Sequence, residues 1–318
     1  MQRGPLCIVY DNKGTHPVNA CAKGGPCNFY QSSRGHIMSG RDRSQGWKHA
    51  KVSGHKYEQT LATELNEGIN HDLQEFLESK TRGKLMNADA SFGTAHLESI
   101  FSDKTTSKSD IVAEFESNQK LGISVKKSDS GQVWITSLER FVDCCIHYGI
   151  DISEGALWSL CALTGNTKQK KIEYVAPDAV LTTIHKKSGE LLERKDNRLL
   201  AKTIAEYYPG NWEELVDFLA DNYSFIASLA FSRGLNANPI AWADLVYYRE
   251  GSIFDIDEIC SLGNIDLIDV NSRNRSTIWL PFGFLQVHRP TPKGAIKSGP
   301  FSLQFHHNLK RIKQNRVD

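Results

Sequence analysis

One stretch of the sequence brings an acid and an amine into a spacing at which they can act together. Asp110 opens a run of alternating apolar and polar residues, 110–116, and Lys126 stands near the end of a second run, 122–127. Both runs have the length and alternation of a β-strand, whose successive side chains point to opposite faces. The apolar side chains that would share one face are Ile111, Ala113, Phe115, Ile123 and Val125.

If both apolar sets face one core, parity limits the register of the resulting hairpin. One allowed register places Asp110 opposite Lys126 across a three-residue turn. Another, with a longer turn, places Val112 opposite Lys126 and leaves Asp110 as the diagonal neighbour. In both registers Asp110 and Lys126 share a face within reach of each other, since directly opposed Cβ atoms lie about 5 Å apart. The sequence therefore predicts a carboxylate–amine site at one end of a hairpin.

Such a site suits the hydrolysis of a phosphodiester bond. The phosphate is anionic and repels hydroxide, whereas Mg²⁺ held by a carboxylate offsets that charge and lowers the pKa of a bound water, and a lysine can orient the water. Mg²⁺ takes oxygen ligands and keeps several waters, so one or two carboxylates and a backbone carbonyl suffice. The carbonyl of Val125, between Ser124 and Lys126, is a candidate for the last of these ligands.

The elements around the hairpin predict an α/β (α+β) fold with one sheet rather than two separate domains. Helical spacing of apolar residues predicts one amphipathic helix from Lys56 to about Leu77, and a third strand is expected at Gln132–Thr136. Residues 1–50, rich in Gly, Asn, Ser and Pro, predict an irregular arm before a domain at 51–318. The remaining expected elements are helices at 138–148 and 153–163, a helical region at 197–233, and late strands within 266–306, at 267–270, 277–287 and 301–305.

Composition excludes several classes of protein. The 38 Lys+Arg and 37 Asp+Glu give a net charge of +1, which excludes a polybasic binder and confines any nucleic-acid surface to local clusters. No apolar run approaches the ~20 residues of a membrane span, and no secretory signal opens the chain, so a soluble, cytoplasmic protein is expected. The seven cysteines are scattered, which argues against a disulfide scaffold. A zinc cluster could be formed by Cys7, Cys21 and Cys27 with His16 and His36. Because no CxxC pair occurs among them, free thiols in a loop are the preferred interpretation.

The segments HKYEQTLATEL and KSDIVAEF…GISVKKSDSGQVWITSLERF resemble the PD-(D/E)XK nuclease superfamily, and more narrowly type II restriction endonucleases and phage-encoded endonucleases. The likeness covers about residues 55–145. It implies a restriction-endonuclease-like mixed central sheet flanked by helices, with a helical insertion and late C-terminal strands. It also implies Mg²⁺-dependent cleavage of double-stranded DNA, with Mn²⁺ as a substitute, by a homodimer in a bacterial or phage-infected cell.

By the same resemblance, Asp110 takes the metal-bridging role, Lys126 the role of catalytic lysine, and Glu58 the role of the glutamate on the first helix. Two positions depart from the superfamily's pattern: Ser109 stands in place of proline, and Ser124 stands in place of the second carboxylate. The second departure leaves the number of metal ions open, and Ser124 is either a spacer or part of the ligand sphere. Other acids that could contribute are Glu64, Glu67, Glu114 and Glu116.

The serine also keeps a second hypothesis open, a non-catalytic DNA-binding or phage structural protein with a degraded nuclease-like site. Taken singly, an Asp before a strand and a Lys after one are more often solvated charges than catalytic groups. Gln132 is either a neighbour of the site or a solvated strand start.

The remaining signals are local. The basic clusters Lys168, Lys170 and Lys171, and Lys310 and Arg311, either hold DNA phosphates or form solvated faces. His306 and His307 are adjacent, whereas an HNH nuclease disperses its histidines, so a strand end or a phosphate contact is expected there. Trp242, Tyr247 and Tyr248 are expected in the core near a helix end.

Overall fold

The computed structural model describes residues 9–10, 17–18, 43–94, 96–166, 180–185, 191–196, 198–263, 265–270, 276–288 and 301–316. The chain divides into two compact units, Met1–Trp47 and Lys48–Asp318. In the first unit β1 (Val9–Tyr10) pairs antiparallel with β2 (Pro17–Val18). Helix α1 (Arg43–Asn66) begins inside the segment expected to be an irregular arm. The candidate zinc ligands Cys7, Cys21, Cys27, His16 and His36 lie outside the described residues.

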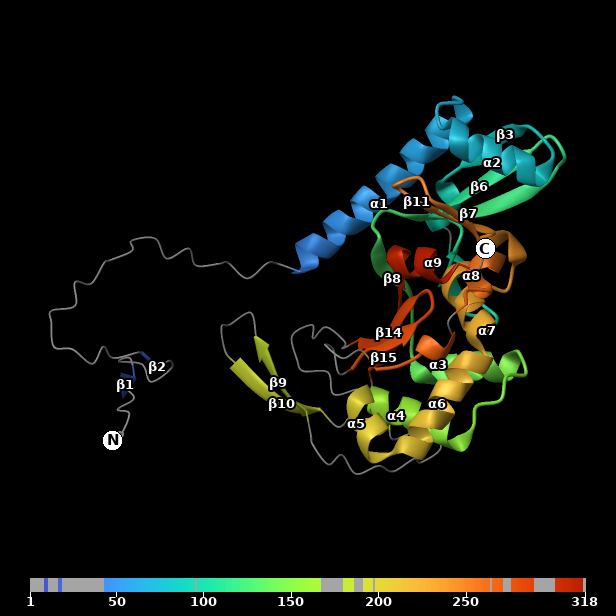
Figure 1. Ribbon diagram of the computed structural model, residues 1–318. Coiled ribbons are helices and arrows are strands. Elements are labelled where there is room, and N and C mark those ends of the chain that lie inside the picture. Colours follow the sequence, from blue (N-terminus) through green and yellow to red (C-terminus); the bar gives the residue numbers. More distant parts are fainter. Residues whose placement is uncertain are drawn as a thin grey trace, which may run out of the picture. The chain divides into compact units, whose positions relative to one another are not determined.

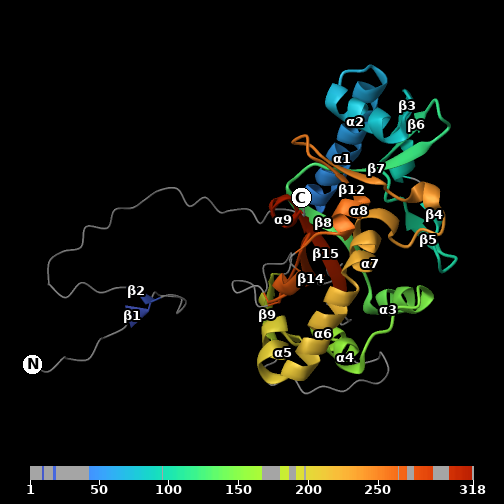
Figure 2. The ribbon, with the colours of Figure 1, turned by 45° about the vertical axis from the view of Figure 1, so that its right-hand side comes forward.

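The second unit is a mixed α/β structure. Both ribbon views show a sheet with α1 and α2 (His71–Thr81) at one end, a second sheet in the middle, and helices α3 to α6 at the other end (Figures 1 and 2). A mixed central sheet flanked by helices was expected, and this part of the fold-class prediction is confirmed.

The five-stranded sheet carries the predicted hairpin. Its order is β12-β11-β7-β6-β3, in which β11 runs parallel to β7 and the other neighbours are antiparallel. Helices α1 and α2 contribute leucines to the core beside this sheet, and the five apolar residues of the hairpin lie together in that core, as parity predicted. The strands are β3 (Leu85–Asp89), β6 (Ile111–Phe115), β7 (Lys120–Lys126), β11 (Leu245–Tyr248) and β12 (Ile253–Asp255).

The four-stranded sheet is antiparallel throughout, in the order β13-β14-β15-β8. The prediction of one sheet is therefore wrong, because the late strands pair with β8 in a sheet separate from that of the hairpin. Trp134, Leu303 and Phe305 of this sheet belong to a large apolar core that also contains residues of α3, α4, α6 and α7. The strands are β8 (Ser130–Thr136), β13 (Ile278–Leu280), β14 (Gly283–His288) and β15 (Ser302–Asn308).

The remaining helices and two hairpins complete the second unit. The α-helices are α3 (Leu138–His147), α4 (Glu154–Thr164), α5 (Ala201–Tyr207), α6 (Pro209–Asp221), α7 (Tyr223–Ser228), α8 (Ile256–Cys260) and α9 (Leu309–Asn315). The π-helix is η3 (Leu229–Arg233), and the 3₁₀ helices are η1 (Ser91–Thr94), η4 (Pro239–Ala241) and η5 (Ile265–Leu267). The hairpins pair β4 (His96–Glu98) with β5 (Lys104–Thr106) and β9 (Val180–His185) with β10 (Leu191–Asp196).

The single helix predicted from Lys56 to Leu77 is two helices. The chain leaves α1 through Gly68, whose φ of +67° is easily adopted without a Cβ. Asn70 then caps α2 by accepting the N–H of Leu73 at 3.3 Å. Ile69, which was counted in the apolar stripe, is 59% exposed in the connection. The periodicity hides the break because both helices bury leucines in the same core.

Three further boundaries differ from the prediction. The helical region 197–233 is divided at Tyr208, where Pro209 starts α6 without needing an N–H acceptor, and again at Asn222. The strand expected at 277–287 is the hairpin of β13 and β14. The strand expected at 267–270 is wrong, since residues 265–267 form η5 and Val270 makes only an isolated bridge.

The aromatic pair Tyr247 and Tyr248 is buried in the core as expected, but it lies on the unpredicted strand β11 rather than near a helix end. Cys144, Cys145 and Cys161 are buried free thiols, and burial raises the pKa of each, to about 12, 12 and 11. Among the described helices, none combines the length and apolar character that crossing a bilayer requires.

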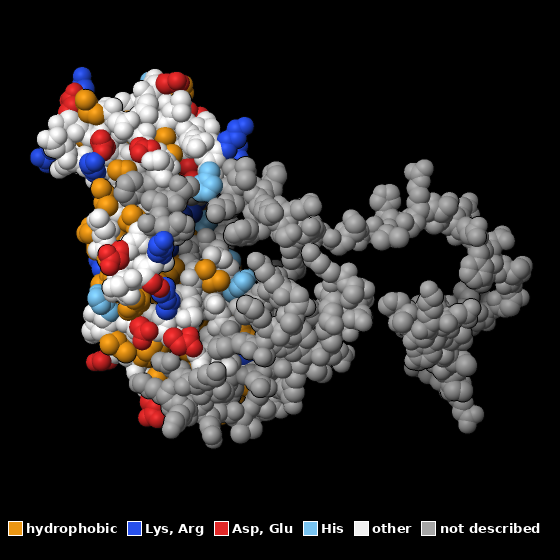
Figure 3. Space-filling view, turned by 180° about the vertical axis from the view of Figure 1, so that it is seen from behind, with side chains coloured by type: hydrophobic (Ala, Val, Ile, Leu, Met, Phe, Trp, Pro, Cys, Tyr) orange, Lys and Arg blue, Asp and Glu red, His pale blue; other side chains and the backbone are white. Residues whose placement is uncertain are grey.

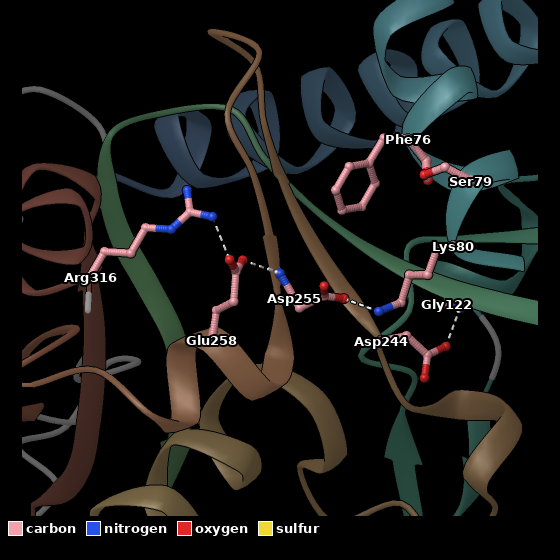
Figure 4. A network of polar contacts seen from close by, with 8 residues as sticks. All are labelled: Phe76, Ser79, Lys80, Gly122, Asp244, Asp255, Glu258 and Arg316. Atoms are coloured by element: carbon pink, nitrogen blue, oxygen red, sulfur yellow. Dashed lines mark hydrogen bonds and ion pairs between the residues drawn. The ribbon is translucent and has the colours of Figure 1, made fainter. Parts of the chain in front are cut away.

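Polar contacts fix the parallel pairing of β7 with β11. Asp244 accepts the N–H of Gly122 at its Oδ2, 2.7 Å away, and donates its own N–H to the Gly122 carbonyl at 2.7 Å. Figure 4 shows this carboxylate beside the ion pair of Lys80 with Asp255, while Glu258 links Arg316 to the Asp255 N–H. The ion pairs join α2 to the end of β12 and the residue after α9 to α8, next to the Asp244–Gly122 contacts that hold β7 against the start of β11.

We expect Gly122→Ala to destabilise the protein, because an added Cβ would lie 2.1 Å from the Trp242 carbonyl oxygen and 2.9 Å from Ser109 Oγ. The backbone must shift to admit it, which should lower the free energy of unfolding by about 1–3 kcal/mol in urea titrations. Gly210→Ala is the control, because nothing lies within 4 Å of its added Cβ in α6. Equal stability of the two variants would contradict the close packing at Gly122.

Candidate active site

β6 and β7 form the expected hairpin in a register that neither alternative gave. Ile111 lies opposite Ile123 and Glu114 opposite Lys120, so Asp110 comes opposite Ser124. The turn, residues 116–118, is centred one residue earlier than expected and uses Asn118 at a φ of +60°. Both predicted registers are therefore wrong, by two residues for the nearer one. The parity is correct, so Asp110, Ser124 and Lys126 still share a face.

Asp110 is held by β7 through its side chain. Its Oδ2 accepts the backbone N–H of Val125 at 2.7 Å and the Ser124 hydroxyl at 3.3 Å, and its own N–H donates to the Ile123 carbonyl at 2.9 Å. Hydrogen bonds that end on an ionised carboxylate are stronger than those between neutral groups. The carboxylate is thereby fixed at the point where β6 begins.

Ser124 links the acid to the amine. The Nζ of Lys126 donates to Ser124 Oγ at 2.6 Å, and Ser124 Oγ in turn donates to Asp110 Oδ2. Among the described side chains Lys126 makes no direct ion pair with Asp110, and Ser124 is only 2% exposed. Ser124 is therefore more than a spacer, because it sets the position of the lysine relative to the aspartate.

Glu58 approaches Asp110 from α1. Burial raises the pKa of the Glu58 carboxyl, and the neighbouring Asp110 carboxylate raises it further. His55, whose Nδ1 lies 3.1 Å from Glu58 Oε2, and the charge of Lys127 act in the opposite direction. The Glu58 side chain is 13% exposed. Two acids that repel each other in a largely buried position would both be stabilised by a cation between them.

Lys126 is half-buried beside these two acids. Burial lowers the pKa of its amine, while the charges of Asp110 and Glu58 raise it. The site thus contains two carboxylates and one amine whose solvation by water is restricted, and the electrostatic interactions among them are stronger than they would be on the surface.

The Val125 carbonyl has the orientation that a metal ligand from this strand requires. In a β-strand the N–H and the C=O of one residue point to the same side. Because the Val125 N–H donates to Asp110, the carbonyl of Val125 also points toward the side of the strand on which Asp110 lies. Asp110, Glu58 and this carbonyl form an all-oxygen donor set, which is what Mg²⁺ prefers. The described residues contain no cluster of three or more His, Cys, Asp or Glu side chains placed to hold a metal ion.

Two residues that the sequence interpretation did not single out lie near Asp110. Gly93 of η1 packs against it so closely that an added Cβ would lie 3.2 Å from the Asp110 Cα. Lys108 is half-buried, and its Nζ donates to the carbonyls of Val133 and Ala230 at 2.7 and 2.6 Å. Burial lowers the pKa of Lys108 to about 7, helped by the charge of Lys126 and opposed by Asp110. Lys108 could have been singled out from the sequence by its position, two residues before Asp110.

Arg249, just after β11, is a third unpredicted neighbour. Its guanidinium lies 5.5 Å from the ring centroid of Tyr57, one residue before Glu58, and its charge lowers the pKa of Lys127. Lys127 therefore places positive charge near Glu58, with Arg249 beside it, although no sequence pattern connects residue 249 with residue 58. Glu114, in contrast, pairs with Lys120 near the turn, and Glu116 lies exposed in the turn, away from Asp110.

The two adjacent histidines have different surroundings. His307 is 2% exposed, and its Nδ1 lies 3.1 Å from the hydroxyl of Tyr248 on β11. Burial lowers the pKa of His307 to about 3, with further contributions from the charges of Lys126 and His306. His307 is thus a neutral core residue near Lys126, and the Tyr248 contact joins the two sheets.

The predicted DNA-contacting residues are only partly described. Lys168, Lys170 and Lys171 lie outside the described residues. Lys310 is exposed at the start of α9. Arg311 is half-buried, with its guanidinium 4.8 Å from the Trp279 ring centroid and its Nε donating to the Leu280 carbonyl, so it also has a packing role.

Comparison of the chain with protein-family models, curated proteins and solved structures gave no match in any of the three.

Ser124→Ala should expose the structural role of the hydroxyl. It removes an acceptor from the half-buried Lys126. A fully buried polar group left unpaired costs about 1–3 kcal/mol, so we expect a loss of unfolding free energy of up to this size in urea. The double variant Ser124→Ala with Lys126→Met has no unpaired amine. Its loss of unfolding free energy should therefore be smaller than the sum of the losses in the two single variants. Strict additivity of the two substitutions would show that the Ser124–Lys126 hydrogen bond does not stabilise the fold.

His307 should make stability depend on pH. Unfolded histidine has a pKa of about 6.5, whereas the pKa of folded His307 is about 3. Unfolding therefore takes up a proton between these values, and stability falls as the pH falls through this window. The slope due to His307 approaches about 1.4 kcal/mol per pH unit below the unfolded pKa. Denaturation between about pH 6 and pH 4 should show a shallower slope for His307→Gln, while His71→Gln, which changes an exposed histidine, should keep the parent's slope.

Proposed function

We propose that this protein is a Mg²⁺-dependent DNA endonuclease of the PD-(D/E)XK type, restriction-like or phage-encoded. The observation that carries the proposal is the joint position of Asp110 and Glu58 beside the half-buried Lys126, with Ser124 linking the lysine to the aspartate. The order of elements also agrees with the resemblance: a helix with the glutamate, a strand with the aspartate, a turn and a strand with the lysine. Ser109, in place of proline, is buried and bonds to the Ile111 carbonyl, so the substitution fits this position.

The residues that would hold the metal are Asp110, Glu58 and the Val125 carbonyl. A bound Mg²⁺ would supply a Lewis acid that polarises the phosphate and lowers the pKa of a water. The electrostatic need for a cation is visible in the raised pKa of Glu58, which Asp110 helps to cause. Mn²⁺ prefers the same oxygen ligands and is expected to substitute.

Lys126 would act on the attacking water. Its amine is fixed by Ser124 and can donate a hydrogen bond to that water or to a phosphate oxygen as negative charge develops there. Because burial lowers the pKa of Lys126, the amine loses a proton more readily than a surface lysine does. Lys126 can therefore orient the nucleophile and assist its deprotonation.

The DNA would be held by local positive charge rather than by one large patch. Figure 3 shows acidic, basic and apolar side chains interspersed over the described part of one face. Three of the described cations near the site, Lys127, Arg249 and Lys310, can each contact a phosphate. A homodimer would supply the two sites that cutting both strands requires.

The serine at position 124 favours one alternative, a DNA-binding protein or phage structural protein without activity. Ser124 reduces the number of carboxylates, and its hydrogen bond occupies the lysine. A purified chain that binds duplex DNA but leaves it uncut in Mg²⁺ and in Mn²⁺ would favour this alternative.

The endonuclease proposal predicts that Asp110→Asn and Lys126→Met each slow Mg²⁺-dependent cleavage of supercoiled plasmid by at least about a hundredfold, because each removes a group that acts on the developing charge. DNA binding and thermal stability should change little by comparison. EDTA should abolish cleavage by the parent protein.

The matched controls are Glu114→Gln and Lys120→Met, which change an exposed acid–amine pair near the turn of the same hairpin. Both control variants should cut at the parent's rate. If Asp110→Asn cuts as fast as its control, the role given to the aspartate is wrong.

A further inference from the structure

The second sheet presents a row of uncharged hydrogen-bonding side chains on the face opposite its apolar core. Gln286 of β14 donates to Gln304 Oε1 at 2.9 Å, and Gln304 of β15 donates to Gln132 Oε1 at 2.5 Å. His306 belongs to the same face, with its Nε2 2.9 Å from Gln286 Nε2 and its ring stacked on Phe284 at a centroid distance of 4.5 Å. Three amides and an imidazole are thus joined across three strands.

The row holds one glutamine in a defined position at the sheet edge. Gln304 is 7% exposed, whereas Gln132 is exposed on β8, which is an edge strand of its sheet. Because Gln132 Oε1 accepts from Gln304, the amide NH₂ of Gln132 is the donor at the outer end of the row. Ile135 lies on the same strand and the same face, opposite Gln304, and is 39% exposed. The edge strand therefore presents a fixed donor next to an apolar group.

β8 is continuous with the candidate active site. It begins at Ser130, shortly after Lys126, and its start pairs with the end of β15, where Asn308 precedes the exposed Lys310. Lys127 and Lys310 thus both lie near the start of β8, at one end of this uncharged edge. Cations suit phosphates, while amides and apolar groups suit base edges. The charge distribution consequently matches a DNA groove with a phosphate backbone beside it.

We propose that β8 lies along the major groove of the DNA substrate and that Gln132 and Ile135 read base edges there. A glutamine amide can donate to guanine O6 and N7, adenine N7 or thymine O4, and an apolar side chain can contact the thymine methyl. Gln304 and Gln286 are positioning residues that hold the Gln132 amide. The inference rests on the proposed function, in that it takes duplex DNA as the ligand.

The test uses the full chain and a library of duplexes with randomised sequence, selected for binding in Ca²⁺ and then sequenced. The parent protein should enrich a motif. Gln132→Met should remove the preference at one base pair and weaken binding to the enriched duplex by about 5- to 150-fold, the equivalent of a lost base contact. Ile135→Ser should alter the preference at a neighbouring base pair. Binding to a scrambled duplex should stay within about twofold for both variants, since phosphate contacts remain.

Gln119→Met is the control, because Gln119 is an exposed glutamine beside the turn of the β6–β7 hairpin, and it should leave the motif unchanged. An enriched motif that survives Gln132→Met and Ile135→Ser unchanged, or the absence of any enriched motif, would overturn the inference. The endonuclease proposal is judged separately by plasmid cleavage. Cutting without sequence preference would retain the endonuclease proposal and reject base reading by β8. Selection of a motif without any cutting would retain base reading and reject the endonuclease proposal.

Discussion

The hydrogen bond from the Val125 N–H to the Asp110 carboxylate is the contact on which the site depends. Just before Asp110 the chain leaves the sheet, because the N–H groups of Lys108 and Ser109 both donate to the Ala241 carbonyl. The Asp110 side chain then accepts a hydrogen bond from the Val125 N–H of β7, which a longer β6 would have satisfied with a backbone carbonyl. One interaction therefore ends the ladder between β6 and β7 and orients the acid, and an unsatisfied strand N–H would accompany any movement of the carboxylate.

Ser124 keeps Lys126 close to Asp110 without a direct ion pair between them. A direct ion pair between Asp110 and Lys126 would offset the negative charge on which the proposed metal site depends. With the serine hydroxyl between them, Asp110 and Glu58 keep their mutual repulsion while Lys126 stays close and fixed. A carboxylate at position 124 would pair with the lysine directly. The serine thus makes the site depend on Glu58 for its second acid, which places part of the site on α1 rather than on the sheet.

The sequence predicted what period-2 alternation controls and missed what distant contacts control. Alternation gave the shared face of Asp110 and Lys126, because exchanging the two faces of either strand would expose Ile111 and Ile123. The exact register depended on Asn118 adopting a left-handed conformation in the turn, which no alternation encodes. Strand β11 was missed because it is short and fully buried, so that it has no alternation to detect. Gly93 and Arg249 reach the site through tertiary contacts, which have no local signature, whereas Lys108 could have been found from its position two residues before Asp110.

The two sheets meet close to Lys126, and this has a consequence for the proposed substrate. Tyr248 is paired with Lys126 on the first sheet, and its hydroxyl bonds to His307 on the second, one residue from the His306 that belongs to the glutamine row. His307 and His306 point to opposite faces of β15, one toward the lysine and one toward the proposed base-reading face. A shift of β15 would therefore move His306 and His307 together. Because interiors are close-packed and resist gradual deformation, a DNA sequence that fits the glutamine row poorly would also disturb the surroundings of Lys126.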